Sequence, residues 1–276
     1  MSYKIVSDSA SDILSIEGIN FESVPLTIVT EEKEYIDDEN LNVDQMVTDL
    51  REYQGKSHTS CPSTGKYLQS YEGNDEVYVV TITSKLSGSY NSAVVAKNMY
   101  LEENPNAKVH VFDSLSTGPE MKLLIEKIIE LKNKGYSFEE VVEKATSYLE
   151  TTELYFCLES IHNLAVNGRV SKLSDIATRL LNIRIVGKAR EGVLHVLNKC
   201  MGAKKSLRTL FDFVKDKCNG LKVRISHVNN LSMSEALKQL ILNSFQHAQV
   251  EIYKSTGLCS YYAEEGGVLI AFETAK

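Results

Sequence analysis

Short apolar runs alternate with longer segments of helical period in the first half of the chain. The strand-like runs, rich in Val, Ile, Tyr and Thr, cover residues 4–7, 23–29, 77–83 and 109–113. Helical patterns cover residues 46–53 and 141–149, and each follows a capping signal: Asn42 with Gln45 before the first, Ser137 with Glu140 before the second. Strands separated by helices predict β-α-β units and a largely parallel sheet with helices on both faces.

The second half of the chain has a different pattern. It predicts strands at 154–158, 221–228, 250–253 and 268–273, a hairpin from 183–186 to 193–198, and helices at 160–166, 207–214 and 234–245. Asn167-Gly168 is expected to end the first of these helices, and Ser232 with Glu235 to cap the last. We therefore predict a two-lobed α/β protein, with an N-terminal lobe at 1–150 and a smaller α/β lobe at 151–276. The cleft between the lobes is the expected ligand site.

Charge and cysteine content narrow the classes of partner. The 276 residues include 37 acidic and 30 basic side chains, a net charge of −7, whereas nucleic-acid-binding domains usually carry a basic surface. No apolar run is long enough to span a membrane, and the first residues do not resemble a signal peptide. The five cysteines are scattered without a C-x-x-C pair, as expected for reduced thiols. These features predict a cytoplasmic protein without stable membrane insertion or a nucleic-acid partner.

The common signatures of catalysis are missing from the sequence. No G-x-S-x-G, H-E-x-x-H or G-x-G-x-x-G occurs, and the six histidines show no metal-ligand spacing. Gly55-Lys56-Ser57 resembles the end of a phosphate loop, but Leu50 stands where the opening glycine is required. The sequence therefore predicts no metal, no cofactor and no nucleotide loop.

Four hydroxyl-rich turns carry the candidate chemistry. They cover residues 8–12, 59–65, 84–92 and 113–118, and three of them directly follow a predicted strand. Ser, Thr and Asp are ordinary helix N-caps, so any one turn alone is explained by capping. Parallel strands, however, bring their carboxyl ends to one edge of a sheet, where helix N-termini offer free N–H groups. Together the turns predict a site for one small anionic group, with Gly88 allowing close approach of backbone to a ligand.

Several motifs in order resemble the DegV family of bacterial fatty-acid-binding proteins, the lipid-presenting subunits of fatty acid kinase. They are the Asp-Ser-x-x-Asp of 8–12, the Thr-Ser-x-Pro-Ser of 59–63, the Leu-Ser-Gly-Ser-Tyr-x-Ser-Ala of 86–93, Asp113-Ser114, the Gly-Arg-Val-Ser of 168–171 and Gly266-Gly267. The resemblance spans nearly the whole chain. It implies a two-lobed α/β fold that holds one long-chain fatty acid, such as palmitate or stearate, as its ligand.

The resemblance also implies roles for individual residues. Thr59, with Ser60 beside it, and Ser87, followed by Gly88, are expected to hold the carboxylate. Arg169 is expected near the phosphoryl group or the surface that meets the kinase catalytic subunit. Tyr262 stands about where kinase-coupled members carry a histidine. A tyrosine stays neutral near pH 7 and cannot balance a phosphate as a protonated histidine can, so this departure bears on kinase coupling.

Two further expectations concern the acyl chain of the ligand and the alternative functions. The partly apolar segments 173–185 and 193–197 are candidates for the acyl channel, although core packing is the favoured explanation for any single residue in them. We predict a non-catalytic lipid-binding protein. One alternative is an acyl hydrolase or transferase with Ser87 as nucleophile, which needs a base such as His58 within hydrogen-bond reach. The other is a lipid-responsive interaction protein without a kinase partner.

Overall fold

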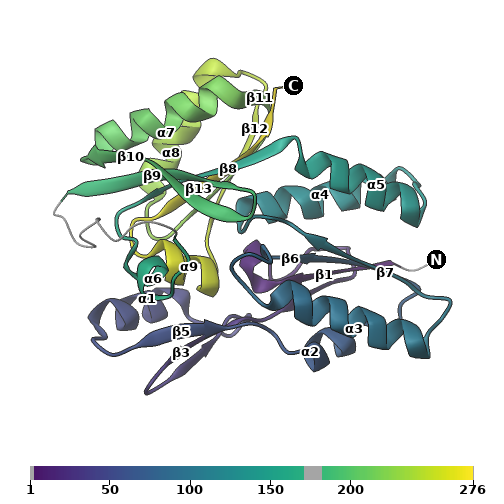
Figure 1. Cartoon of the computed structure of the whole chain (residues 1–276). Coiled ribbons are helices and arrows are strands. Elements are labelled where there is room, and N and C mark those ends of the chain that lie inside the picture. The colour runs from purple at the N-terminus through teal and green to yellow at the C-terminus, as the bar shows by residue number, and fades with distance from the viewer. Residues whose placement is uncertain (1–2, 171–181, 276) are drawn as a thin grey trace.

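An all-parallel sheet forms the first layer of the structure, a computed structural model that describes residues 3–170 and 182–275 (Figure 1). Its strands are β1 (Tyr3–Asp8), β2 (Phe21–Val24), β6 (Glu76–Thr81) and β7 (Lys108–Asp113), in the order β2-β1-β6-β7. A short 3-10 turn, η1 (Ser9–Ser11), follows β1. Because all four strands run the same way, the turns after β1, β6 and β7 meet at one edge.

Helices cover both faces of this sheet. They are α2 (Thr64–Tyr71), α3 (Ser89–Glu103), α4 (Pro119–Asn133) and α5 (Phe138–Leu149). Apolar side chains of α2 and α3 bury one face, and those of α4 and α5 bury the other. The parallel sheet with two covered faces confirms the fold predicted for this half. The capping box of Ser137 with Glu140 is also confirmed at the start of α5.

A six-stranded mixed sheet forms the second layer. Its strands are β8 (Thr152–Leu158), β9 (Ile183–Arg190), β10 (Val193–Met201), β11 (Cys218–His227), β12 (Gln249–Lys254) and β13 (Val268–Thr274), in the order β10-β9-β8-β13-β11-β12. Two helices, α7 (Ala203–Lys217) and α8 (Leu231–Ser244), pack on one face. The predicted hairpin is confirmed, because Glu191 and Gly192 link β9 to β10 with φ of +53° and +83°.

The other face of the mixed sheet packs on α4 and on a small group of further elements. These further elements are the strands β3 (Thr27–Thr30), β4 (Glu34–Ile36) and β5 (Ser57–Ser60) and the helices α1 (Val43–Glu52), α6 (His162–Val166) and α9 (Gly257–Ala263). One apolar cluster joins Ile28 and Met46 to Leu154 and Phe156, so segments from both sides of residue 150 share a core. The division into 1–150 and 151–276 stays a prediction.

Two local predictions were wrong. The single strand expected at 23–29 is broken at Pro25, because proline has no N–H to donate; β2 ends at Val24 and β3 begins in another sheet. The last long helix is capped by Asn230, whose side chain accepts from the N–H of Met233, and not by Ser232. An asparagine two residues earlier in the chain already accepts from the free N–H group, so Ser232 is not needed as a cap.

In the part of the chain that the structure describes, no helix is long and apolar enough to cross a membrane.

Candidate functional site

A cavity lies where the carboxyl edge of the parallel sheet faces β8, β9, β10 and α9. It encloses about 780 Å³ of atom-free space, its open mouth included. The turns after β6 and β7 supply one wall and the mixed sheet supplies the other, so neither layer forms the cavity alone.

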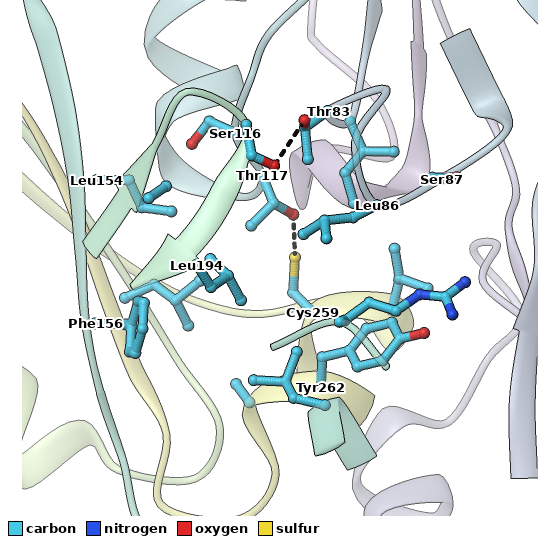
Figure 2. A pocket seen from close by; sticks show the side chains of 18 of the residues that line it. Thr83, Leu86, Ser87, Ser116, Thr117, Leu154, Phe156, Leu194, Cys259 and Tyr262 are labelled. Carbon is cyan, nitrogen blue, oxygen red and sulfur yellow. Dashed lines mark hydrogen bonds between the residues drawn. The ribbon is translucent and has the colours of Figure 1, made fainter. Parts of the chain in front are cut away.

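One end of the cavity is apolar. Leu154, Phe156 and Leu158 alternate along β8 and therefore project from the same face of the strand. Leu194 from β10 and Leu269 from β13 add further alkyl surface. Figure 2 shows Leu154, Phe156 and Leu194 gathered at the side remote from Ser87. This end can bury a hydrocarbon but offers little to a charged group.

The other end is polar. Thr59 projects into the cavity from β5, and its hydroxyl lies 2.8 Å from the phenolic oxygen of Tyr262 on α9. Ser87 lines the same end, and its hydroxyl accepts a hydrogen bond of 3.2 Å from the N–H of Ser89. Burial raises the pKa of Tyr262, against the opposing effects of the Thr59 hydrogen bond and of the positive charge of Arg169. Tyr262 is therefore a neutral donor at pH 7.

Arg169 reaches this end because of the way α6 stops. The helix ends at Val166, and Gly168 takes φ of +68°, a conformation that favours glycine. The N–H of Arg169 then donates to the carbonyl of Leu164 at 2.8 Å, and its guanidinium donates to the carbonyl of Asn167. The predicted stop at Asn167-Gly168 is confirmed. It turns a half-buried guanidinium toward the polar end of the cavity.

The structure separates the predicted site residues into two groups. Thr59, Ser87, Arg169 and Tyr262 all line the one cavity, although the last two were expected on a phosphoryl or partner surface. Ser60 is exposed and follows Thr59 in β5, so strand alternation turns it to the opposite face. Gly88, also exposed, is not a lining residue; a Cβ there would lie 3.1 Å from the sulfur of Cys61, so Gly88 lets the turns 59–65 and 84–92 touch.

The rival catalytic arrangement is not formed in the described residues. His58 precedes Thr59 in β5 and is exposed on the face that points away from the cavity. Among the described residues, the hydrogen-bond partner of the Ser87 hydroxyl is the N–H of Ser89. A serine nucleophile needs a base in contact, so this pair does not resemble an activated serine. The described residues also contain no cluster of three metal-ligating side chains.

Comparison with known proteins places these residues in a family. The family model described as "Uncharacterised protein, DegV family" matches residues 2–274. The chain belongs to the DegV family. It is 45% identical to a DegV domain-containing protein of Streptococcus pneumoniae over 279 residues, covering 99% of each chain.

Two solved structures of DegV-type proteins resemble the chain over its length. One is a DegV family protein of Eubacterium eligens loaded with heptadecanoic acid, with 41% identity, a TM-score of 0.96 and coverage of 99% of this chain and 100% of that one. The other is the Fatty Acid Kinase (Fak) B3 protein of Streptococcus pneumoniae loaded with linoleic acid, with 43% identity, a TM-score of 0.96 and full coverage of both chains.

The first family motif of this DegV chain serves to position the site. Asp8 is fully buried, and its carboxylate accepts from the N–H of Ile82 at 2.9 Å and from the hydroxyl of Ser89 at 2.6 Å. Ser89 also lies 2.7 Å from the hydroxyl of Tyr67. Asp8 therefore fixes both ends of the loop that presents Ser87. It is not itself among the residues that line the cavity.

Two further aspartates fix the start of α9, which carries Tyr262. Asp12 accepts from the N–H of Thr256 at 2.9 Å, and Asp37 accepts from the N–H groups of Gly257 at 2.6 Å and Leu258 at 2.8 Å. The positive end of this short helix is therefore already neutralised by protein carboxylates. Sequence analysis missed Asp37, because nothing in the local pattern marks it.

Other cavity residues were also missed. The side chains of β8 read as ordinary strand core, and only the tertiary arrangement turns them toward a cavity. Thr117 and Cys259 meet midway along the wall, with the hydroxyl 3.4 Å from the sulfur (Figure 2). Of the two predicted tail segments, 193–197 contributes Leu194, whereas residues 173–181 lie outside the described part of the chain.

Buried carboxyl groups around this site have unusual proton affinities. Burial raises the pKa values of Asp8, Asp12 and Glu120 from ordinary carboxyl values to about 7, and that of Asp37 to about 6, although hydrogen bonds to each group oppose the shift. A raised carboxyl pKa means that the native state holds protons that the unfolded state has already lost. Stability from these groups is therefore lost as the pH rises through about 6–7.

When the pH is lowered from about 8 to about 6.5, we expect the free energy of unfolding to increase by about 1–2 kcal/mol. In the lower part of that range and below it His110 and His227 oppose the trend, because burial lowers their pKa values and the unfolded state gains protons there that the native state does not. Urea unfolding at the two pH values measures the change. Asp8→Asn should reduce it, whereas Asp75→Asn, at an exposed position, should not. If both variants show the same change in the free energy of unfolding between the two pH values, the buried carboxyl groups are not its cause.

Proposed function

We propose that this DegV protein binds one long-chain fatty acid in this cavity. The carboxylate lies among Thr59, Ser87, Arg169 and Tyr262, and the acyl chain runs toward Phe156. The observation that carries the proposal is the division of one cavity into a polar and an apolar end. The heptadecanoic acid and linoleic acid held by the two similar structures support a ligand of this class.

The polar end suits a carboxylate. An anion that leaves water needs hydrogen-bond donors, and three hydroxyl groups and one guanidinium line this end. The pair of Thr59 and Tyr262, 2.8 Å apart, can turn both protons toward a bound carboxylate oxygen. The guanidinium of Arg169 supplies the balancing charge, so the ligand binds as the ionised acid.

The acyl chain supplies most of the affinity. Burying about fifteen methylenes at roughly 0.8 kcal/mol each gives a gross contribution on the order of 12 kcal/mol before ordering costs. Palmitate and stearate are therefore suitable ligands on energetic grounds.

The bound carboxylate is then presented to a separate kinase. No nucleotide loop occurs in the sequence, so the ATP-dependent step belongs to a fatty acid kinase catalytic subunit. Similarity to the Fak B3 protein supports this role. We place the protein in the cytoplasm as its non-catalytic lipid carrier, consistent with its five free cysteines.

Mass spectrometry of lipid extracted from the purified native protein tests the proposal directly. We expect an intact long-chain fatty acid at about one molecule per chain. A parallel assay follows hydrolysis of an activated acyl ester by the wild-type protein and by Ser87→Ala. Ester turnover that disappears in Ser87→Ala would contradict the carrier role and favour acyl transfer.

Thr59→Ala is expected to weaken fatty-acid binding to the delipidated protein by about tenfold. The variant loses one hydroxyl donor to a charged group, worth about 1.5 kcal/mol. Ser60→Ala is the matched control, because Ser60 is the next residue on the opposite face of β5. Isothermal titration of the two variants measures the difference. Equal affinities would place the carboxylate elsewhere.

A further inference from the structure

An aromatic ring lines the cavity on the side remote from Ser87 (Figure 2). Figure 2 shows Phe156 and Leu154 across the cavity from Ser87 and Tyr262. Phe156 is 4% exposed and stands on β8 near the middle of the mixed sheet. Its position along the proposed acyl channel makes it the candidate for the last contact that a chain makes.

Gly187 creates the space in which this ring lies. Phe156 pairs with Gly187 on β9 and with Leu269 on β13, so the three residues form one row across the sheet. A Cβ at Gly187 would lie 2.3 Å from Cζ of Phe156 and 2.4 Å from the carbonyl oxygen of His195. Real Cβ atoms do not approach so closely. The ring tip therefore rests on the backbone of β9, and any side chain at 187 would displace it.

We infer that the Phe156 ring, seated on Gly187, sets the upper limit on the length of the acyl chain. The inference rests on the proposed function and adds its specificity-determining residue. The ring is held in place by the row of Gly187 and Leu269 on the two neighbouring strands. A chain that is too long must move this rigid group or fold back, and it loses affinity either way.

The test measures the affinities of saturated fatty acids of about fourteen to twenty carbons for delipidated wild-type protein, Phe156→Leu and Phe156→Ala. In the wild type, affinity is expected to rise about fourfold per added methylene and then to stop rising at a limiting length. In Phe156→Ala that limit should move up by about two methylenes, with a smaller move in Phe156→Leu. Phe156 is varied and Gly187 is not, because a side chain at 187 would also meet the carbonyl of His195.

Phe272→Leu is the matched control. Phe272 is a buried phenylalanine on β13 of the same sheet, packed against Tyr155 in the cluster on the other face and not lining the cavity. In Phe272→Leu the affinity should stop rising at the same acyl-chain length as in the wild type. An unchanged limit in the Phe156 variants, with a cooperative unfolding transition in Phe156→Leu, would overturn the inference and leave the proposed function standing. An equal shift in Phe272→Leu would also overturn it. If the wild type binds none of the acids, the proposed function fails as well.

Discussion

Arg169→Ala is expected to weaken the binding of a long-chain fatty acid by about thirtyfold to a hundredfold, about 2–3 kcal/mol. The carboxylate would keep the hydroxyls of Thr59 and Tyr262 but lose the one positive charge that lines this end of the cavity in the described residues. Titration of delipidated protein with a fatty acid measures the loss. The family resemblance implied a place for Arg169 near the phosphoryl group or the kinase surface. Because Arg169 lines the cavity and its charge acts on Tyr262, we propose that it also binds the carboxylate.

The methyl ester of the same fatty acid provides the control. An ester has no charge for Arg169 to balance, so Arg169→Ala should change its affinity by less than about threefold. Arg169→Lys keeps the charge but not the planar pair of donors, and should fall between the wild type and Arg169→Ala. Acyl-phosphate formation with a fatty acid kinase should decline at least in parallel. If acid and ester lose affinity equally, Arg169 acts through packing and the carboxylate lies elsewhere.

Asp37→Ala is expected to lower the free energy of unfolding by about 3 kcal/mol. The side chain is 1% exposed and accepts from the N–H groups of Gly257 and Leu258, which would be left without partners at the start of α9. Urea unfolding measures the loss. Because α9 carries Tyr262, fatty-acid affinity should fall in the same variant.

Asp38→Ala separates this effect from a general loss of an acidic residue. Asp38 is the next residue, half-buried, and its carboxylate accepts from the N–H of Asn40 in a local turn. We expect it to cost about 1 kcal/mol or less and to leave fatty-acid affinity unchanged. Asp37→Asn keeps one acceptor oxygen and should lose less than Asp37→Ala. Equal losses in Asp37→Ala and Asp38→Ala would show that the two N–H groups of α9 find other partners.

The elements that the sequence predicted correctly depend on neighbours a few residues away. The capping box of Ser137, the stop at Gly168 and the hairpin turn at Gly192 all follow from backbone geometry within about four residues. The predicted parallel sheet follows from strands and helices of ordinary length in alternation. The failures were also local: Pro25 ended a strand, and Asn230 capped a helix in place of Ser232.

The site was predictable only in part. Thr59, Ser87, Arg169 and Tyr262 were named from motifs, but their meeting at one end of one cavity was not, because Thr59 and Tyr262 are separated by 203 positions in the chain. The period of a strand also says which residues share a face, not what that face meets. Leu154 and Phe156 therefore looked like ordinary core.

By itself the sequence determined the local elements, the family and the residue types available for binding a carboxylate. Only the tertiary structure decided which of these residues face the cavity. It turned Ser60 outward and Thr59 inward, gave Asp8 and Asp37 their supporting roles, and placed Phe156 across the cavity from Ser87. The physical reason is the distance along the chain over which each kind of interaction acts. Propensities, caps and turns act within a few residues, whereas a cavity forms where two sheets fail to fill the space between them, and that depends on side chains far apart in the chain.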